Sequence, residues 1–74
     1  QKMLNVPVKG GAEIVAQESV RAAIARAEKS GVRMVVRPSG TEPLVRILAE
    51  GDESAAEDAA HLVERAVLSC AEAL

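Results

Sequence analysis

Residues 33–50 read RMVVRPSGTEPLVRILAE and contain two short apolar segments joined by a compact polar turn. Residues 33–37 are rich in β-branched side chains, and the residue before Pro38 is pushed toward extended geometry, so we expect a strand that runs straight into the turn. Residues 44–50 supply the outgoing strand, with Pro43 at its start, where a backbone donor is dispensable. This stretch predicts an antiparallel pair of strands.

A further strand is predicted over residues 3–8, before this pair in the chain. Its apolar side chains alternate and share one face of the strand: Leu4, Val6 and Val8. Pro7 removes one ladder donor, which confines the strand to the edge of a sheet. Two glycines then break the pattern, and residues 9–17 are predicted to form a loop whose Ile14 and Val15 tuck under the sheet.

Two segments have helical periodicity. Residues 18–30 repeat apolar side chains at spacings of three and four before a stop signal at Gly31, and the stripe is Val20, Ala23, Ile24 and Ala27. A second helix is predicted to begin at Ser54, which forms a capping box with Glu57. Its stripe is Ala59, Leu62, Val63, Ala66, Val67, Cys70 and Leu74. The order β-α-β-β-α predicts an α+β, two-layer sandwich with the helices on one face of a small mixed or antiparallel sheet.

Size and composition restrict the class of protein. The 74 residues form one small domain, which we expect to be a piece of a longer polypeptide because it begins at Gln1. No aromatic residue is present, so the core must be aliphatic. A nucleic-acid binder needs a basic face and stacking side chains, and the net charge here is -2. We therefore do not expect nucleic acid as a partner.

Membrane insertion and disulfide bonding are also not expected. No apolar run approaches the roughly 18 residues of a spanning helix, and no signal segment opens the chain. The single Cys70 cannot form an internal disulfide and lies on an apolar stripe, which suits packing in a reducing compartment. The sequence predicts a cytoplasmic protein.

The turn at residues 37–43 combines several kinds of phosphate ligand. A dianion requires converging donors, and a guanidinium, hydroxyls and backbone N–H groups can supply them. We expect Gly40 to adopt a conformation closed to other residues, so that the N–H groups of Ser39, Gly40 and Thr41 turn inward as an anion nest. Arg37 adds a charge-assisted contact. The alternative is an ordinary hairpin turn beside an exposed arginine.

The remaining charged residues are predicted to have supporting or structural roles. Glu42 would repel phosphate, so we expect it to pair with Arg46 or Arg37 or to cap the turn. Arg46 is a weaker candidate for ligand contact. His61 has no second ligand at metal-binding spacing, so no metal site is predicted. Because no nucleophile lies beside a base, the chain is expected to bind and not to catalyse.

Residues 35–47, VVRPSGTEPLVRI, resemble the C-terminal, fourth domain of the α-D-phosphohexomutase superfamily, and are most similar to its bacterial aminosugar branch. The resemblance extends over nearly the whole chain and implies the two-layer, TBP-like fold of that domain. It also implies that Arg37, Ser39, Gly40 and Thr41 contact a substrate phosphate. Some relatives have Asn at the position of Gly40, so only a backbone contact remains there.

The resemblance further implies an isomerase. In such four-domain enzymes a phosphoserine of the first domain, beside Mg²⁺ held by aspartates of another domain, phosphorylates glucosamine 6-phosphate. The 1,6-bisphosphate then turns around to give glucosamine 1-phosphate, for UDP-N-acetylglucosamine synthesis. The fourth domain clamps the phosphate that is not reacting, so the implied partners are the sugar phosphate and the other domains of the same chain.

Three expectations follow for this chain by itself. It lacks the phosphoserine loop and the metal aspartates, so it should bind no cofactor and be inactive alone. Its nearest alternative identity is the C-terminal domain of a mutase for mannose or glucose phosphates. A non-catalytic protein-interaction module, using the last helix and the open sheet face, is the alternative from a different class.

Overall fold

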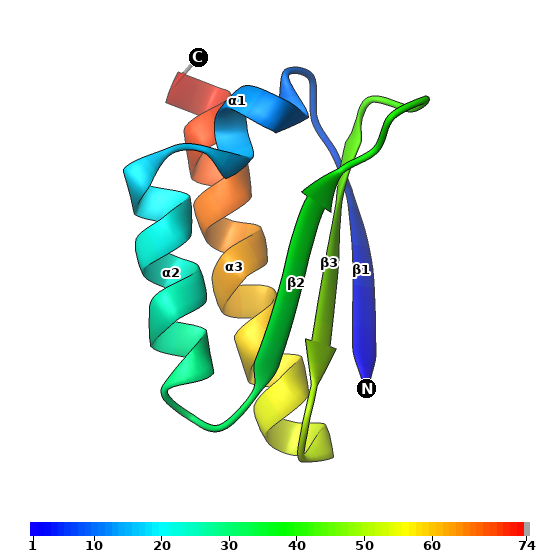
Figure 1. The fold of residues 1–74 in the computed structure, drawn as a ribbon. Helices are drawn as coiled ribbons and strands as arrows, with labels where there is room; N and C mark the ends of the chain where they lie inside the picture. The colour runs from blue at the N-terminus through cyan, green and yellow to red at the C-terminus, as the bar shows by residue number, and fades with distance from the viewer. Residues whose placement is uncertain (74) are drawn as a thin grey trace.

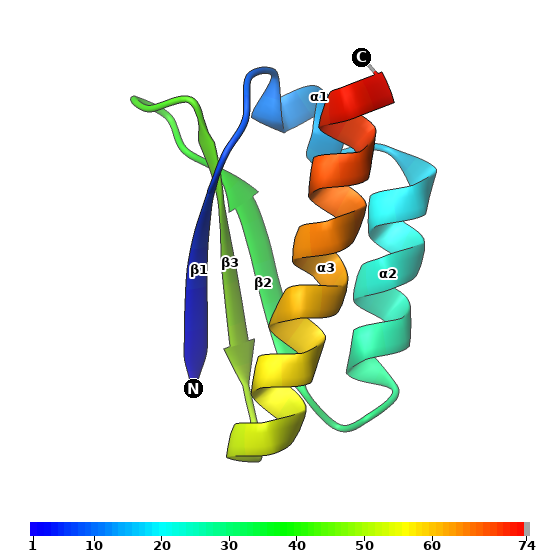
Figure 2. The same ribbon diagram turned by 180° about the vertical axis from the view of Figure 1, so that it is seen from behind.

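The computed structural model describes residues 1–73 and consists of a sheet layer and a helix layer. The elements are β1 (Lys2–Pro7), α1 (Gly11–Val15), α2 (Glu18–Glu28), β2 (Arg33–Pro38), β3 (Leu44–Glu50) and α3 (Glu53–Ala73). Figures 1 and 2 show the helices on one side of the sheet, whose other face is open. The predicted α+β two-layer sandwich is confirmed. Leu74, predicted to extend the last apolar stripe, lies outside the described residues.

β3 is the central strand of a three-stranded sheet with the order β1-β3-β2. Both pairings are antiparallel, which settles the choice between a mixed and an antiparallel sheet. The side chains of β3 that face the helices are each 0% exposed: Val45, Ile47 and Ala49. Alternation then sends the intervening side chains, such as Arg46, to the open face. Pro7 lies on the edge strand β1, as predicted.

Small side chains close the helix layer over the sheet. The buried residues of α3 are Ala56, Ala59, Ala60, Val63 and Val67. Those of α2 are Val20, Ala23 and Ala27. Alanine at these contacts lets the helices approach the sheet and each other closely, so a core without aromatic rings is still filled. None of the helices within residues 1–73 is long and apolar enough to cross a membrane.

The loop prediction for residues 9–17 is wrong, because the short helix α1 lies there. Gly10 adopts a left-handed conformation (φ 70°, ψ 37°), and the Ile14 N–H donates to Gly10 O at 3.0 Å, so the helix starts soon after β1. Ile14 is 0% exposed, and its burial was predicted. Five residues are too few for a periodic pattern to be recognised. Burial of one side chain stabilises this helix.

The predicted start of the last helix is also wrong. The Ala55 N–H donates to Asp52 Oδ2 at 3.4 Å, and the Ala56 N–H donates to Asp52 O at 2.7 Å. Asp52 therefore occupies the N-cap, α3 begins at Glu53, and Ser54 lies within the first turn. Aspartate is as good an N-cap as serine, and its charge also suits the positive end of the helix dipole.

This difference predicts unequal effects of two alanine substitutions. Asp52→Ala should lower the free energy of unfolding by about 1 kcal/mol, because it removes the cap. Ser54→Ala should change it by less than about 0.5 kcal/mol, because Ser54 is exposed and caps nothing. Urea unfolding of the two variants measures both values. A larger loss of stability for Ser54→Ala than for Asp52→Ala would support the predicted capping box, with Ser54 as the N-cap.

Candidate functional site

The loop between β2 and β3 projects beyond the end of the sheet, at the end where α1 lies (Figures 1 and 2). Its base is closed by the Ser39 N–H, which donates to Leu44 O at 2.9 Å. Its outgoing side is tied to the chain after β1 by the Val8 N–H, which donates to Pro43 O at 2.9 Å. The loop is therefore held at its base, while residues 40–42 are exposed.

Gly11 packs directly beneath this base. A Cβ added at Gly11 would lie 3.1 Å from Pro38 Cβ and 3.2 Å from Val45 Cγ2. Contacts this short would force the neighbouring atoms to move, so the glycine allows α1 to approach the start of the loop. Helix α1, which the sequence did not predict, therefore packs against the base of the loop that carries the candidate site.

Two backbone donors of the loop converge on one oxygen. The N–H groups of Thr41 and Glu42 point to Ser39 Oγ, with N···O distances of 3.4 and 3.2 Å. Consecutive N–H groups aimed at a single point are the arrangement that an anion nest requires. The Ser39 N–H, which we expected in the nest, is used by the hairpin. The two observed donors are therefore the N–H groups of Thr41 and Glu42. The predicted set, Ser39, Gly40 and Thr41, began earlier in the chain and did not include Glu42.

Arg37 and Arg46 occupy directly opposite positions on β2 and β3. Both lie on the open face and both are exposed. Like charges in this relation repel each other. Within residues 1–73 no salt bridge joins Glu42 to Arg37 or Arg46, so that predicted pairing is wrong, while the alternative that Glu42 caps the turn stays a prediction. The two guanidinium groups leave an excess of positive charge on this part of the open face.

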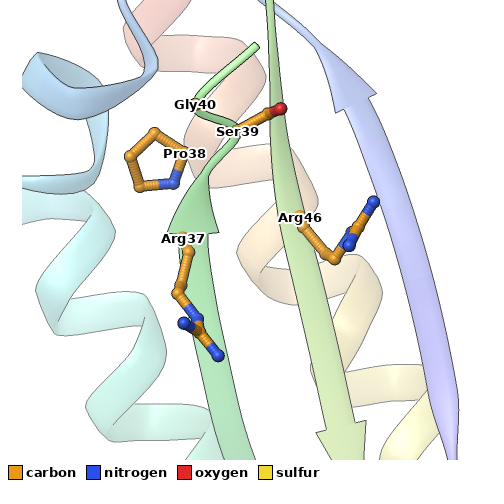
Figure 3. Close-up of a pocket in the computed structure, with 5 residues that line it drawn as sticks. All are labelled: Arg37, Pro38, Ser39, Gly40 and Arg46. Atoms are coloured by element: carbon orange, nitrogen blue, oxygen red, sulfur yellow. The ribbon is translucent and has the colours of Figure 1, made fainter. Parts of the chain in front are cut away.

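A pocket of about 310 Å³ lies between these arginines and the loop. Its lining residues are Arg37, Pro38, Ser39, Gly40 and Arg46 (Figure 3). In that view the Arg37 side chain extends along β2 away from the loop, whereas Arg46 turns toward β1. The volume is near the lower end of small-molecule sites, and it would accept a phosphate group together with part of its carrier.

The structure brings together most of the predicted site residues. Arg37, Ser39 and Gly40 line the pocket, and Arg46, the weaker candidate, lines it as well. Thr41 does not line it and is exposed in the loop. Asn5, which sequence reasoning did not single out, accepts a hydrogen bond from Arg46 Nε at 3.2 Å. Alternation along the first strand placed Asn5 on the open face, but only the register shows which residue it meets.

Gly40 does not have the conformation that we expected. The glycines with positive φ are Gly10, Gly31 and Gly51. A Cβ built on Gly40 would meet no atom within 4 Å. Its backbone is therefore open to other residues, and the prediction of a special conformation is wrong. Gly40 is exposed, lines the pocket and leaves open space where a side chain would lie.

Metal ligands do not assemble at this site. Across the described part of the chain, no three His, Cys, Asp or Glu side chains lie close enough together to hold an ion. The His61 ring is bonded through Nδ1 to Glu64 Oε1 at 2.8 Å. The donors of the pocket, guanidinium, hydroxyl and backbone N–H groups, suit an oxyanion and not a cation.

The comparisons with known proteins agree on one family. A family profile described as "Phosphoglucomutase/phosphomannomutase, C-terminal domain" matches residues 3–67. A phosphoglucosamine mutase of Coxiella burnetii is 39% identical over 71 residues, which cover 90% of this chain and 16% of that protein. That of Rhizobium etli is 47% identical over 58 residues, 74% of this chain and 13% of that protein. That of Thermus thermophilus is 48% identical over 69 residues, 88% of this chain and 16% of that protein.

The backbone of Gly40 predicts that this glycine is dispensable for folding. Gly40→Ala should leave the free energy of unfolding unchanged or raise it by up to about 1 kcal/mol, because alanine restricts the unfolded chain. Gly31→Ala is the matched control: its Cβ would also meet no atom within 4 Å, but its φ is +89°. That variant should be less stable by about 1–2 kcal/mol. Equal losses in both variants, measured by thermal unfolding, would contradict the conformation assigned to Gly40.

Proposed function

The chain belongs to the phosphoglucomutase/phosphomannomutase C-terminal domain family, and we propose that it is the phosphate-clamping domain of a longer, four-domain phosphoglucosamine mutase. The relatives that carry this name are 39–48% identical to it, and it spans 13–16% of their length. The proposed reaction interconverts glucosamine 6-phosphate and glucosamine 1-phosphate through a 1,6-bisphosphate. This domain holds the phosphate that is not reacting.

The observation that supports this role most strongly is that Arg37 and Arg46 occupy opposite positions on β2 and β3 and that neither forms an ion pair within residues 1–73. Phosphate in water is heavily hydrated, and a site replaces that shell only with several converging donors. Arg37 and Arg46 supply two guanidinium groups, and Ser39 supplies a hydroxyl at the same pocket. A dianion between the arginines would also offset their mutual repulsion.

Binding would rearrange the hydrogen bonds inside the loop. Ser39 Oγ now accepts from the N–H groups of Thr41 and Glu42. If the Ser39 hydroxyl turns toward a phosphate oxygen, it can donate its own proton, and the two N–H groups become available to the same anion. The Gly40 N–H and the Thr41 hydroxyl would complete the clamp as the exposed part of the loop closes.

A clamp remote from the reacting atoms can still accelerate the reaction. Binding energy from the distant phosphate fixes the sugar hydroxyl near its attacking position, which converts affinity into a lower barrier. The Mg²⁺ ion of the proposed enzyme would be held by other domains, because residues 1–73 do not offer a ligand set for it. This chain would bind and orient the substrate, and it would be inactive alone.

Replacing Arg37 tests the clamp in the full-length enzyme. Arg37→Ala should lower kcat/KM about 10- to 150-fold, because a hydrogen bond to a charged group contributes about 1.5–3 kcal/mol. Arg33→Ala is the matched control, since Arg33 lies on the same strand and the same face, opposite Glu50. Steady-state kinetics should show little change for that variant. Normal kinetics for Arg37→Ala would contradict its proposed contact.

Sugar preference is tested separately, with glucosamine 6-phosphate, mannose 6-phosphate and glucose 6-phosphate as substrates of the full-length enzyme. We expect the highest kcat/KM with the aminosugar, because the relatives reported above are phosphoglucosamine mutases. A clear preference for either neutral sugar would remove the aminosugar assignment. It would leave the phosphate clamp in place, because the residues of the loop contact the phosphate and not the ring.

A further inference from the structure

Asn5, Arg46 and Arg37 form one row across the open face of the sheet. The register pairs Asn5 with Arg46, and Arg46 with Arg37. Arg46, on the central strand, therefore has an amide on one side and a second guanidinium on the other. We infer that Asn5 is a positioning residue, which holds the Arg46 guanidinium beside the pocket without neutralising it; this inference rests on the proposed function.

The hydrogen bond selects which edge of Arg46 remains available. Arg46 Nε donates to Asn5 Oδ1 at 3.2 Å. Arginine has five N–H donors and no acceptor, so the bond takes one donor and leaves the four on the terminal nitrogens. These four can still hold two oxygens of one phosphate in a bidentate contact. Asn5 thus prepares Arg46 for an end-on approach by the anion and excludes a side-on one.

Electrostatics explains why an amide suits this position. A carboxylate at position 5 would accept the same hydrogen bond, but it would place a negative charge beside the bound phosphate and form an ion pair with Arg46. Among residues 1–73 no acidic side chain forms an ion pair with Arg46. With neutral Asn5, the row carries two positive charges and no negative one. The Arg46 guanidinium is therefore oriented, while the positive charges of both arginines remain available to the anion.

Repulsion between the arginines makes this orientation necessary. Arg37 lies directly opposite Arg46 and is exposed, so the two guanidinium groups tend to move apart into solvent. An arginine side chain without a partner also loses rotamer freedom when it binds a ligand. The bond to Asn5 restricts Arg46 before the ligand arrives, which reduces that loss.

The test compares an isosteric substitution with a remote one. Inorganic phosphate is titrated into the ¹⁵N-labelled 74-residue chain at constant ionic strength, and its Kd is taken from the amide shifts of residues 39–42. Asn5→Asp keeps the shape and the acceptor and should weaken binding about fivefold, as expected for one unit charge added roughly 8 Å from a dianion in water. Gln17→Glu makes the same amide-to-carboxylate change at an exposed position in the helix layer and should leave the Kd unchanged.

A double-mutant cycle tests whether Asn5 acts through Arg46. Asn5→Ala should weaken phosphate binding about threefold, the size expected when one long side chain must be ordered on binding. The same substitution in an Arg46→Ala background should have no effect, because the guanidinium that it positions is gone. The Arg46 Nε–H resonance should shift in Asn5→Ala, because that substitution removes the acceptor of its hydrogen bond.

Separate outcomes overturn the inference and the proposed function. No phosphate response at residues 39–42 in the unaltered chain overturns both. A normal response with the same Kd in Asn5→Asp overturns the inference alone, as does an Asn5→Ala effect that persists without Arg46. Amide spectra of each variant establish that the fold is intact, which the exposure of Asn5 on an edge strand leads us to expect.

Discussion

Arg37 and Arg46 occupy directly opposite positions on β2 and β3, and the candidate site depends on the sheet that keeps them there. Opposed like charges destabilise a strand pair. The register is nevertheless fixed, because a slip of one residue would turn Val45 and Ile47, both 0% exposed, toward solvent. Burial on one face therefore outweighs repulsion on the other. The result is a concentrated positive charge that an anion can offset.

The sheet and the loop contribute differently to the candidate site. The guanidinium groups come from strands, so their origins are fixed by the register. The hydroxyl and the N–H groups come from the loop, where Ser39 Oγ already accepts from Thr41 and Glu42. An anion would replace this internal hydrogen bonding with external contacts, which reduces the net affinity. Modest affinity suits the reaction proposed above, in which the bisphosphate would leave this domain, turn and bind again.

The sequence predicted what depends on local pattern and missed what depends on register. Residues 33–50 identified the hairpin, and the aliphatic stripes identified both long helices. Helix α1 was missed because a single buried side chain, Ile14, stabilises it, and Asp52 was missed as the cap because Ser54 fitted a familiar signature. The contact between Asn5 and Arg46 joins residues 41 positions apart, and no local pattern can predict it.

Binding of glucosamine 6-phosphate to the ¹⁵N-labelled chain, followed residue by residue, tests the clamp most directly. If the anion lies between the arginines and the loop, the largest shifts will be those of the Gly40, Thr41 and Glu42 amides and of the Nε–H groups of Arg37 and Arg46. These shifts should follow the phosphate group, so glucosamine itself should cause none. Shifts confined to the helix layer, or equal shifts with the unphosphorylated sugar, would contradict a phosphate clamp in this chain.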